Sequence, residues 1–84
     1  STQTITVTVN RVMTGQITPN NIDPDLPINF TIEPRNGVGI ATIDNIGNWT
    51  YTVSPDVVGF VILDYTYTQQ GGMTNTGMIS LNLG

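Results

Sequence analysis

Apolar and polar residues alternate along most of the chain. In residues 4–9, Ile5, Val7 and Val9 share one phase, and threonines occupy the other. This period-2 alternation of β-branched residues is typical of a half-buried β-strand. The sequence predicts about seven such strands, near residues 4–9, 13–17, 28–32, 38–44, 48–53, 60–68 and 74–83.

Turn-forming residues separate these runs. Asp23-Pro24-Asp25 follows Pro19-Asn20-Asn21 in the widest gap, which predicts a long loop. The short gap at residues 45–47 predicts a hairpin between the strands on either side of it. Apolar residues nowhere recur at helical spacing over three turns, so no helix is predicted.

Short strands with turn signals about every ten residues indicate an all-β fold. We expect an immunoglobulin-like Greek-key sandwich of about seven antiparallel strands. Parallel pairing would need long crossover connections, which this chain cannot supply. A small closed barrel of the same strands remains an alternative. A length of 84 residues predicts one module over residues 1–84.

The composition narrows the range of partners. The chain has two arginines, six acidic residues, no lysine and no histidine, so it has no basic stripe to bind nucleic acid or anionic lipid. No apolar run approaches the roughly 20 residues of a membrane-spanning helix, so membrane insertion is not expected. Cysteine is absent, which excludes disulfides and thiolate metal sites.

The same composition argues against catalysis. Histidine, cysteine and lysine, three of the usual sources of acid, base or nucleophile, are missing. A hydrolase built on paired carboxylates needs two acids that face each other in a cleft. However, Asp44 and Asp56 fall at predicted strand ends, Asp64 is on an outward phase, and two further aspartates share one loop. We therefore expect that the chain is not an enzyme.

Those two loop residues, Asp23 and Asp25, are the candidate metal ligands. Calcium binds carboxylate and main-chain oxygens of flexible loops, but it takes about six to eight of them. Two carboxylates are too few without further ligands, so a solvated turn is the favoured interpretation. The fold requires no cofactor, and calcium is the ion to test.

The aromatic residues are expected to lie in the core. Trp49, Tyr51, Tyr65 and Tyr67 each share the strand phase of a valine or leucine. Aromatic residues on an inner face are the ordinary filling of a small sandwich. A sugar-stacking platform on these rings is the less favoured alternative.

Several segments resemble a known repeat family. Residues 47–55, Gly59-Phe60 and residues 64–68 look like the second half of the cadherin-like and bacterial immunoglobulin-like tandem repeats of large bacterial surface proteins, the adhesins. The resemblance implies a module from a longer multi-repeat chain, located outside the cell on the bacterial surface, with the adjacent repeats as its neighbours. Family members usually carry an Asp-Gly pair after the aromatic strand, whereas this chain has Gln69-Gln70-Gly71-Gly72.

Three functions follow from these observations. The first is a non-catalytic structural spacer or adhesive repeat. The second is a module that binds a carbohydrate or a host protein through loops at one end, with residues 20–26, 45–47 and 69–72 as the candidate segments. The third is an immunoglobulin-like domain of a viral capsid or tail. Residues 4–9 are also uncharged and β-branched, which suits pairing with another chain.

Overall fold

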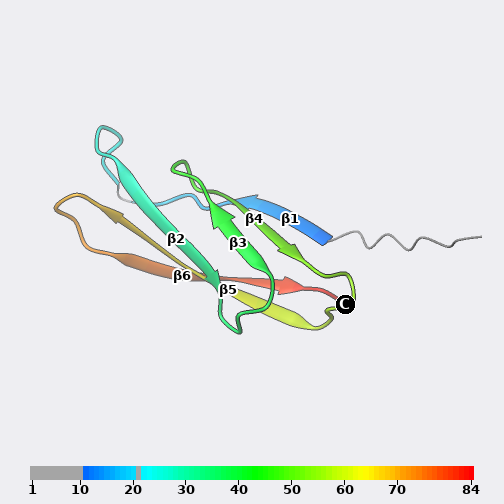
Figure 1. Cartoon of the computed structure of the whole chain (residues 1–84). Coiled ribbons are helices and arrows are strands. Elements are labelled where there is room, and N and C mark those ends of the chain that lie inside the picture. The colour runs from blue at the N-terminus through cyan, green and yellow to red at the C-terminus, as the bar shows by residue number, and fades with distance from the viewer. Residues whose placement is uncertain (1–10, 21) are drawn as a thin grey trace, which may run out of the picture.

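Six β-strands form the part of the chain that the structure describes, residues 11–20 and 22–84 of a computed structural model (Figure 1). Each lies where the alternation predicts a strand. The predicted strand at residues 4–9 lies outside the described residues. The strands are β1 (Arg11–Gln16), β2 (Ile28–Pro34), β3 (Ile40–Ile43), β4 (Asn48–Val53), β5 (Phe60–Gln69) and β6 (Asn75–Asn82).

The strands form two antiparallel sheets of three strands each, in the orders β1-β4-β3 and β2-β5-β6. The predicted hairpin is present, because β3 pairs with β4 with Ala41 opposite Tyr51. β2 and β3 belong to different sheets and pack against each other, which closes one side of the sandwich. The immunoglobulin-like sandwich is therefore confirmed, and a single closed barrel is excluded for the described strands.

The core lies between the sheets and follows the predicted phases. In β4 the inward positions are buried, and in β5 Leu63 is fully buried. Burying a side chain of this size stabilises the fold by about 1.5–3 kcal/mol. The buried hydrophobic residues are Ile17, Trp49, Tyr51, Val53, Val61, Leu63 and Leu83.

The aromatic residues occupy the inner faces, as expected. Trp49 and Tyr51 are buried, and Tyr65 and Tyr67 are partly buried against the core. The Tyr51 hydroxyl donates a hydrogen bond to the main-chain carbonyl of Val38 at 2.6 Å, so its polar end has a partner inside the protein. Trp49 and Tyr51 therefore fill the core, and Tyr65 and Tyr67 pack against it.

β3 is shorter than the predicted strand at residues 38–44. Asn36 closes a local turn by accepting a hydrogen bond from the Val38 N–H at 3.1 Å. Gly39 then adopts a positive φ of 82°, a conformation that interrupts an extended strand. The strand therefore starts only at Ile40. In residues 11–20 and 22–84, no helix is long and apolar enough to span a membrane.

Candidate functional site

Three connections meet at the end of the sandwich opposite the C-terminus (Figure 1). They join β1 to β2, β3 to β4, and β5 to β6. The Ile17 N–H donates to the Gly47 carbonyl at 2.8 Å, which ties the first connection to the second. The structure thus brings together the three segments that the sequence proposed as binding loops, apart from Asn21, which it does not describe.

Gln69 fastens the first connection to the third. Its Nε2 group donates to the main-chain carbonyls of Asp23 at 2.7 Å and Leu26 at 3.1 Å. Its Oε1 atom accepts from the Asp23 N–H at 2.8 Å. One neutral amide therefore holds both ends of the 23–26 turn. Sequence reasoning missed this contact, because Gln69 and Asp23 are 46 positions apart and no local pattern links them.

Asp23 and Asp25, the predicted calcium candidates, lie within this turn. Asp23 Oδ1 accepts a hydrogen bond from the Asp25 N–H at 2.9 Å, and the Asp23 carbonyl also accepts from the Leu26 N–H at 3.2 Å. The carbonyls of Asp23 and Leu26 already accept from Gln69. Across the described residues, no group of three or more acidic, histidine or cysteine side chains gathers. The carboxylate and carbonyl oxygens of this turn do not fit calcium's requirement for about six to eight oxygen ligands.

Asp44 organises the loop between β3 and β4. Its Oδ1 atom accepts from the N–H groups of Asn48 and Ile46, both at 2.9 Å. These bonds favour the ionised carboxylate, and the pKa of Asp44 is lowered chiefly by the Asn48 N–H. Gly47 has a φ of 92° and passes so close to Ile17 that a Cβ atom would lie 2.4 Å from the Ile17 carbonyl oxygen. The loop therefore depends on both residues.

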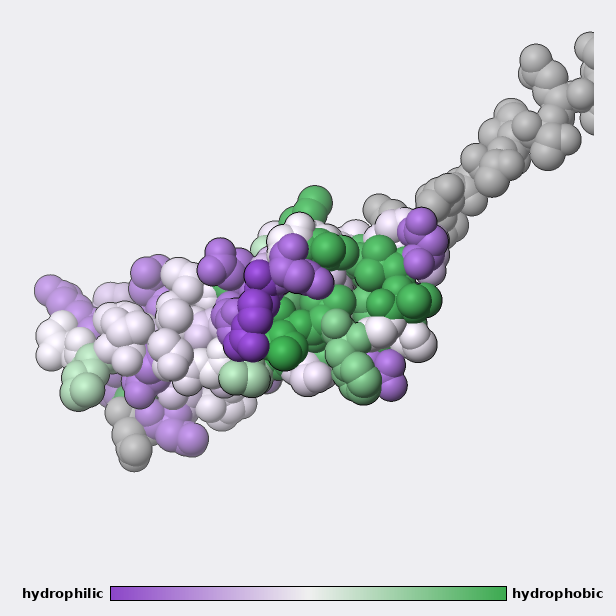
Figure 2. All heavy atoms as spheres, turned by 90° about the horizontal axis from the view of Figure 1, so that it is seen from below, coloured by the Kyte–Doolittle hydropathy of each residue, from purple (hydrophilic) through white to green (hydrophobic). Residues whose placement is uncertain are grey.

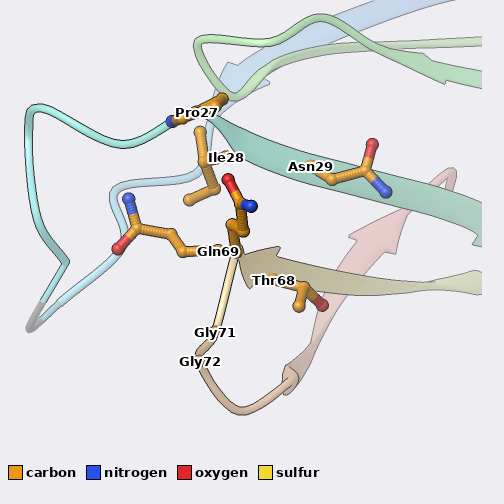
Figure 3. Close-up of a pocket in the computed structure, with 8 residues that line it drawn as sticks. Pro27, Ile28, Asn29, Thr68, Gln69, Gly71 and Gly72 are labelled. Atoms are coloured by element: carbon orange, nitrogen blue, oxygen red, sulfur yellow. The ribbon is translucent and has the colours of Figure 1, made fainter.

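A shallow hollow of about 520 Å³ lies beside Gln69, between the start of β2 and the turn that follows β5 (Figure 3). The side chains of Ile28 and Gln69 come from the two strands, and Gly71 and Gly72 form the adjacent turn. None of the lining residues in the described part carries a charge. The hollow suits at most a neutral polar ligand. It is lined by Pro27, Ile28, Asn29, Thr68, Gln69, Gln70, Gly71 and Gly72.

The remaining acids do not form a catalytic pair. Glu33 and Asp64 are opposite each other in the register of β2 and β5, on the outer face. Arg35 donates two hydrogen bonds to the Asp64 carboxylate, from Nε at 3.0 Å and from Nη2 at 2.7 Å. This hydrogen bonding lowers the pKa of Asp64, whereas a general acid needs a raised pKa. Asp56 likewise has a lowered pKa because Ser54 donates to it.

The two-sheet architecture and these loops define an immunoglobulin-like sandwich module. The bacterial Ig domain family matches residues 1–82, and the chain belongs to this family. No curated protein and no solved structure matches the chain. Bacterial Ig domains are generally non-catalytic and typically occur in surface proteins. The family match confirms the resemblance seen in the sequence.

Proposed function

We propose that the chain is a structural spacer or adhesive repeat of a bacterial cell-surface protein, positioned outside the cell between neighbouring repeats. The observation that supports this role is the Gln69 contact. The amide joins two of the end connections to each other, so it satisfies main-chain groups that a loop-binding site would offer to a ligand. A module that holds its own loops suits a load-bearing position in a chain of repeats.

The acidic residues support a non-catalytic role. The pKa values of Asp44, Asp56 and Asp64 are all lowered, and each carboxylate accepts hydrogen bonds from its own neighbourhood. None of the three is therefore prepared to deliver a proton near neutral pH. The sequence also has no histidine, cysteine or lysine to take that role.

The experiment that tests the spacer role is exchange of the module inside its parent protein on the bacterial surface. One variant carries an unrelated immunoglobulin-like module of similar length, and a second variant lacks the module. If the chain acts as a spacer, the exchange preserves adhesion and the deletion reduces it. Loss of adhesion in the exchanged variant, with unchanged surface expression, would contradict the spacer role and assign the adhesion to the module itself.

Binding of a carbohydrate or a host protein is the second candidate, and the hollow beside Gln69 is the observation that favours it. The side chains of Asn29 and Thr68 supply polar groups to its uncharged lining. Arrays of glycans and host proteins, probed with the chain at about 0.1 mM, would detect even weak binding. Binding that Asn29→Ala and Thr68→Ala abolish, with thermal unfolding unchanged, would favour this function over the spacer.

A further inference from the structure

One side of the sandwich is open in the described part of the chain. β2 and β3 close the opposite side, while β1 and β6 are the outer strands on this one. Met13 on β1 and Ile79 and Leu81 on β6 point inward, yet all three are only partly buried. An apolar strip between β1 and β6 therefore lacks cover from residues 11–20 and 22–84.

The strand order indicates which element of an immunoglobulin sandwich would cover this strip. A seven-strand immunoglobulin sandwich has four strands in one sheet and three in the other, with its first strand beside its second. The orders β1-β4-β3 and β2-β5-β6 correspond to the last six of these strands. The position beside β1 belongs to a first strand. Residues 4–9 have the alternation for it, and their apolar members are Ile5, Val7 and Val9.

A strand at residues 4–9 would have too short a connection to fold back onto its own β1. Only Asn10 separates Val9 from Arg11, and even the tightest common hairpin turn uses about two residues. Arg11 is held in β1, because it pairs with Val53 and its Nη1 group donates to the Leu83 carbonyl at 2.5 Å. A two-residue turn could form only if the register between residues 4–9 and β1 slipped by one position. That slip would place Ile5, Val7 and Val9 on the outer face.

We propose that residues 4–9 pair with β1 of a second copy of this chain. Two copies of the run 4–16 would lie antiparallel across a two-fold axis, with Asn10 opposite its symmetry mate. Val7 would then face Met13, and Ile5 would face Gly15. All of these residues share the inward phase, so each copy covers the other's apolar strip without turn residues. Exchange of one element between identical copies is a recognised route to dimers where the hinge is short.

The end at which the copies would meet is also apolar. Val58 and Phe60 are 70% and 71% exposed. They flank Gly59, which exchanges main-chain hydrogen bonds with Leu83 and Gly84, so they lie at the end where β1 begins. Figure 2 shows hydrophobic side chains gathered over this half of the molecule and polar ones over the other. This surface would gain cover from the second copy.

The first test is the mass of the 84-residue chain in solution, measured by light scattering after size exclusion at about 0.1 mM. We expect twice the 9.1 kDa chain mass. Inserting one glycine between Asn10 and Arg11 supplies an Asn-Gly turn and lets the strand fold back in the same register, so this variant should be a monomer. A glycine inserted between Gly71 and Gly72 is the control and should leave the dimer intact.

A cysteine at the two-fold axis provides an independent readout, because the chain has no cysteine of its own. Asn10→Cys should form a disulfide-linked dimer on mild oxidation, since opposing residues of an antiparallel pair lie about 4.5–5.5 Å apart at Cα. Gln70→Cys, on the exposed turn between β5 and β6 at the other end of the sandwich, should stay monomeric on a denaturing gel. A monomeric wild-type chain, or a dimer that survives the hinge insertion, would overturn the proposal and leave the spacer role standing.

Discussion

The indole ring of Trp49 lies across Gly15, its cross-strand partner on β1. A Cβ atom at residue 15 would come within 2.5 Å of Trp49 Cζ2, well inside contact distance. The second sheet repeats the arrangement, with the Tyr65 ring across Gly77. In each sheet the absence of a side chain on one strand creates the space that an aromatic ring on the next strand fills.

This relationship predicts the cost of adding one methyl group. Gly15→Ala should lower the free energy of unfolding by about 1–3 kcal/mol, because the buried indole must move from a well-packed position. Urea unfolding followed by tryptophan fluorescence measures the change. Thr14→Ala, the neighbour on the exposed phase, is the control and should change stability by less than about 0.5 kcal/mol. An equally stable Gly15→Ala protein would show that Trp49 can adjust freely.

The buried Tyr51 hydroxyl predicts a second effect. Tyr51→Phe keeps the ring but removes the hydrogen bond to the Val38 carbonyl, which should cost about 1–2 kcal/mol. Burial also raises the pKa of Tyr51 above its ordinary value of 10.0. The stabilisation from this hydroxyl is therefore complete below pH 10 and is lost as the pH rises through the folded-state pKa.

Urea titrations at neutral pH and at pH values above about 10 separate the two contributions. The free energy of unfolding of the wild-type protein should exceed that of Tyr51→Phe at neutral pH, and this difference should shrink as the pH rises. A difference in the free energy of unfolding that stays constant through the alkaline range would contradict the raised pKa of Tyr51 in the folded state.

Asp44 predicts the corresponding effect in acid. Its pKa is lowered in the folded state, so its contribution is present above the ordinary value of 3.8 and is lost as the pH falls through the folded-state pKa. Asp44→Asn should therefore be less stable than wild type at neutral pH and converge with it in acid. Thr42→Ala, an exposed and uncharged neighbour, should show an offset that does not change with pH. Urea midpoints across the acid range distinguish the two patterns.

The alternation of apolar and polar residues predicted the strands, because the inward face of a strand can be identified from the sequence of that strand alone. Residues 48–53 show this most clearly, since the inward phase of Trp49, Tyr51 and Val53 is the buried phase of β4. The contacts that shape the end loops could not be predicted in the same way. Gln69 reaches Asp23, 46 positions away, and no local pattern marks a glutamine as the partner of a distant carbonyl.

The pairing of Trp49 with Gly15 could not be predicted from the sequence for a related reason. A glycine inside a strand pattern indicates close approach of another group, but it does not say which group. Identifying the indole requires the register of β1 against β4, which depends on the complete sheet. The shared position of the candidate loops was easier to predict. When successive strands are antiparallel, every second connection lies at the same end of the sandwich.

Gln69 predicts a local loss of order. Gln69→Ala removes three hydrogen bonds to the 23–26 turn, so we expect faster hydrogen exchange at the Asp23 amide and a loss of about 1–2 kcal/mol in stability. Gln70→Ala, the exposed neighbour, is the matched control and should leave both measurements unchanged. Retained protection at Asp23 in the Gln69→Ala protein would mean that the turn holds its shape without the amide.

The same amide predicts how the chain responds to calcium. Gln69 already donates to the carbonyls of Asp23 and Leu26, so millimolar calcium should shift the thermal midpoint of the wild-type chain by less than about 1 °C relative to excess chelator. In Gln69→Glu a carboxylate would face those carbonyls and replace a donor by a third negative group beside Asp23 and Asp25. That variant should unfold at a lower temperature in chelator and recover with calcium, because the cation supplies the missing positive partner. Circular dichroism melts of both proteins provide the comparison. A rise of several degrees in the wild-type chain would instead show that its native state binds calcium and would refute the role assigned to the amide.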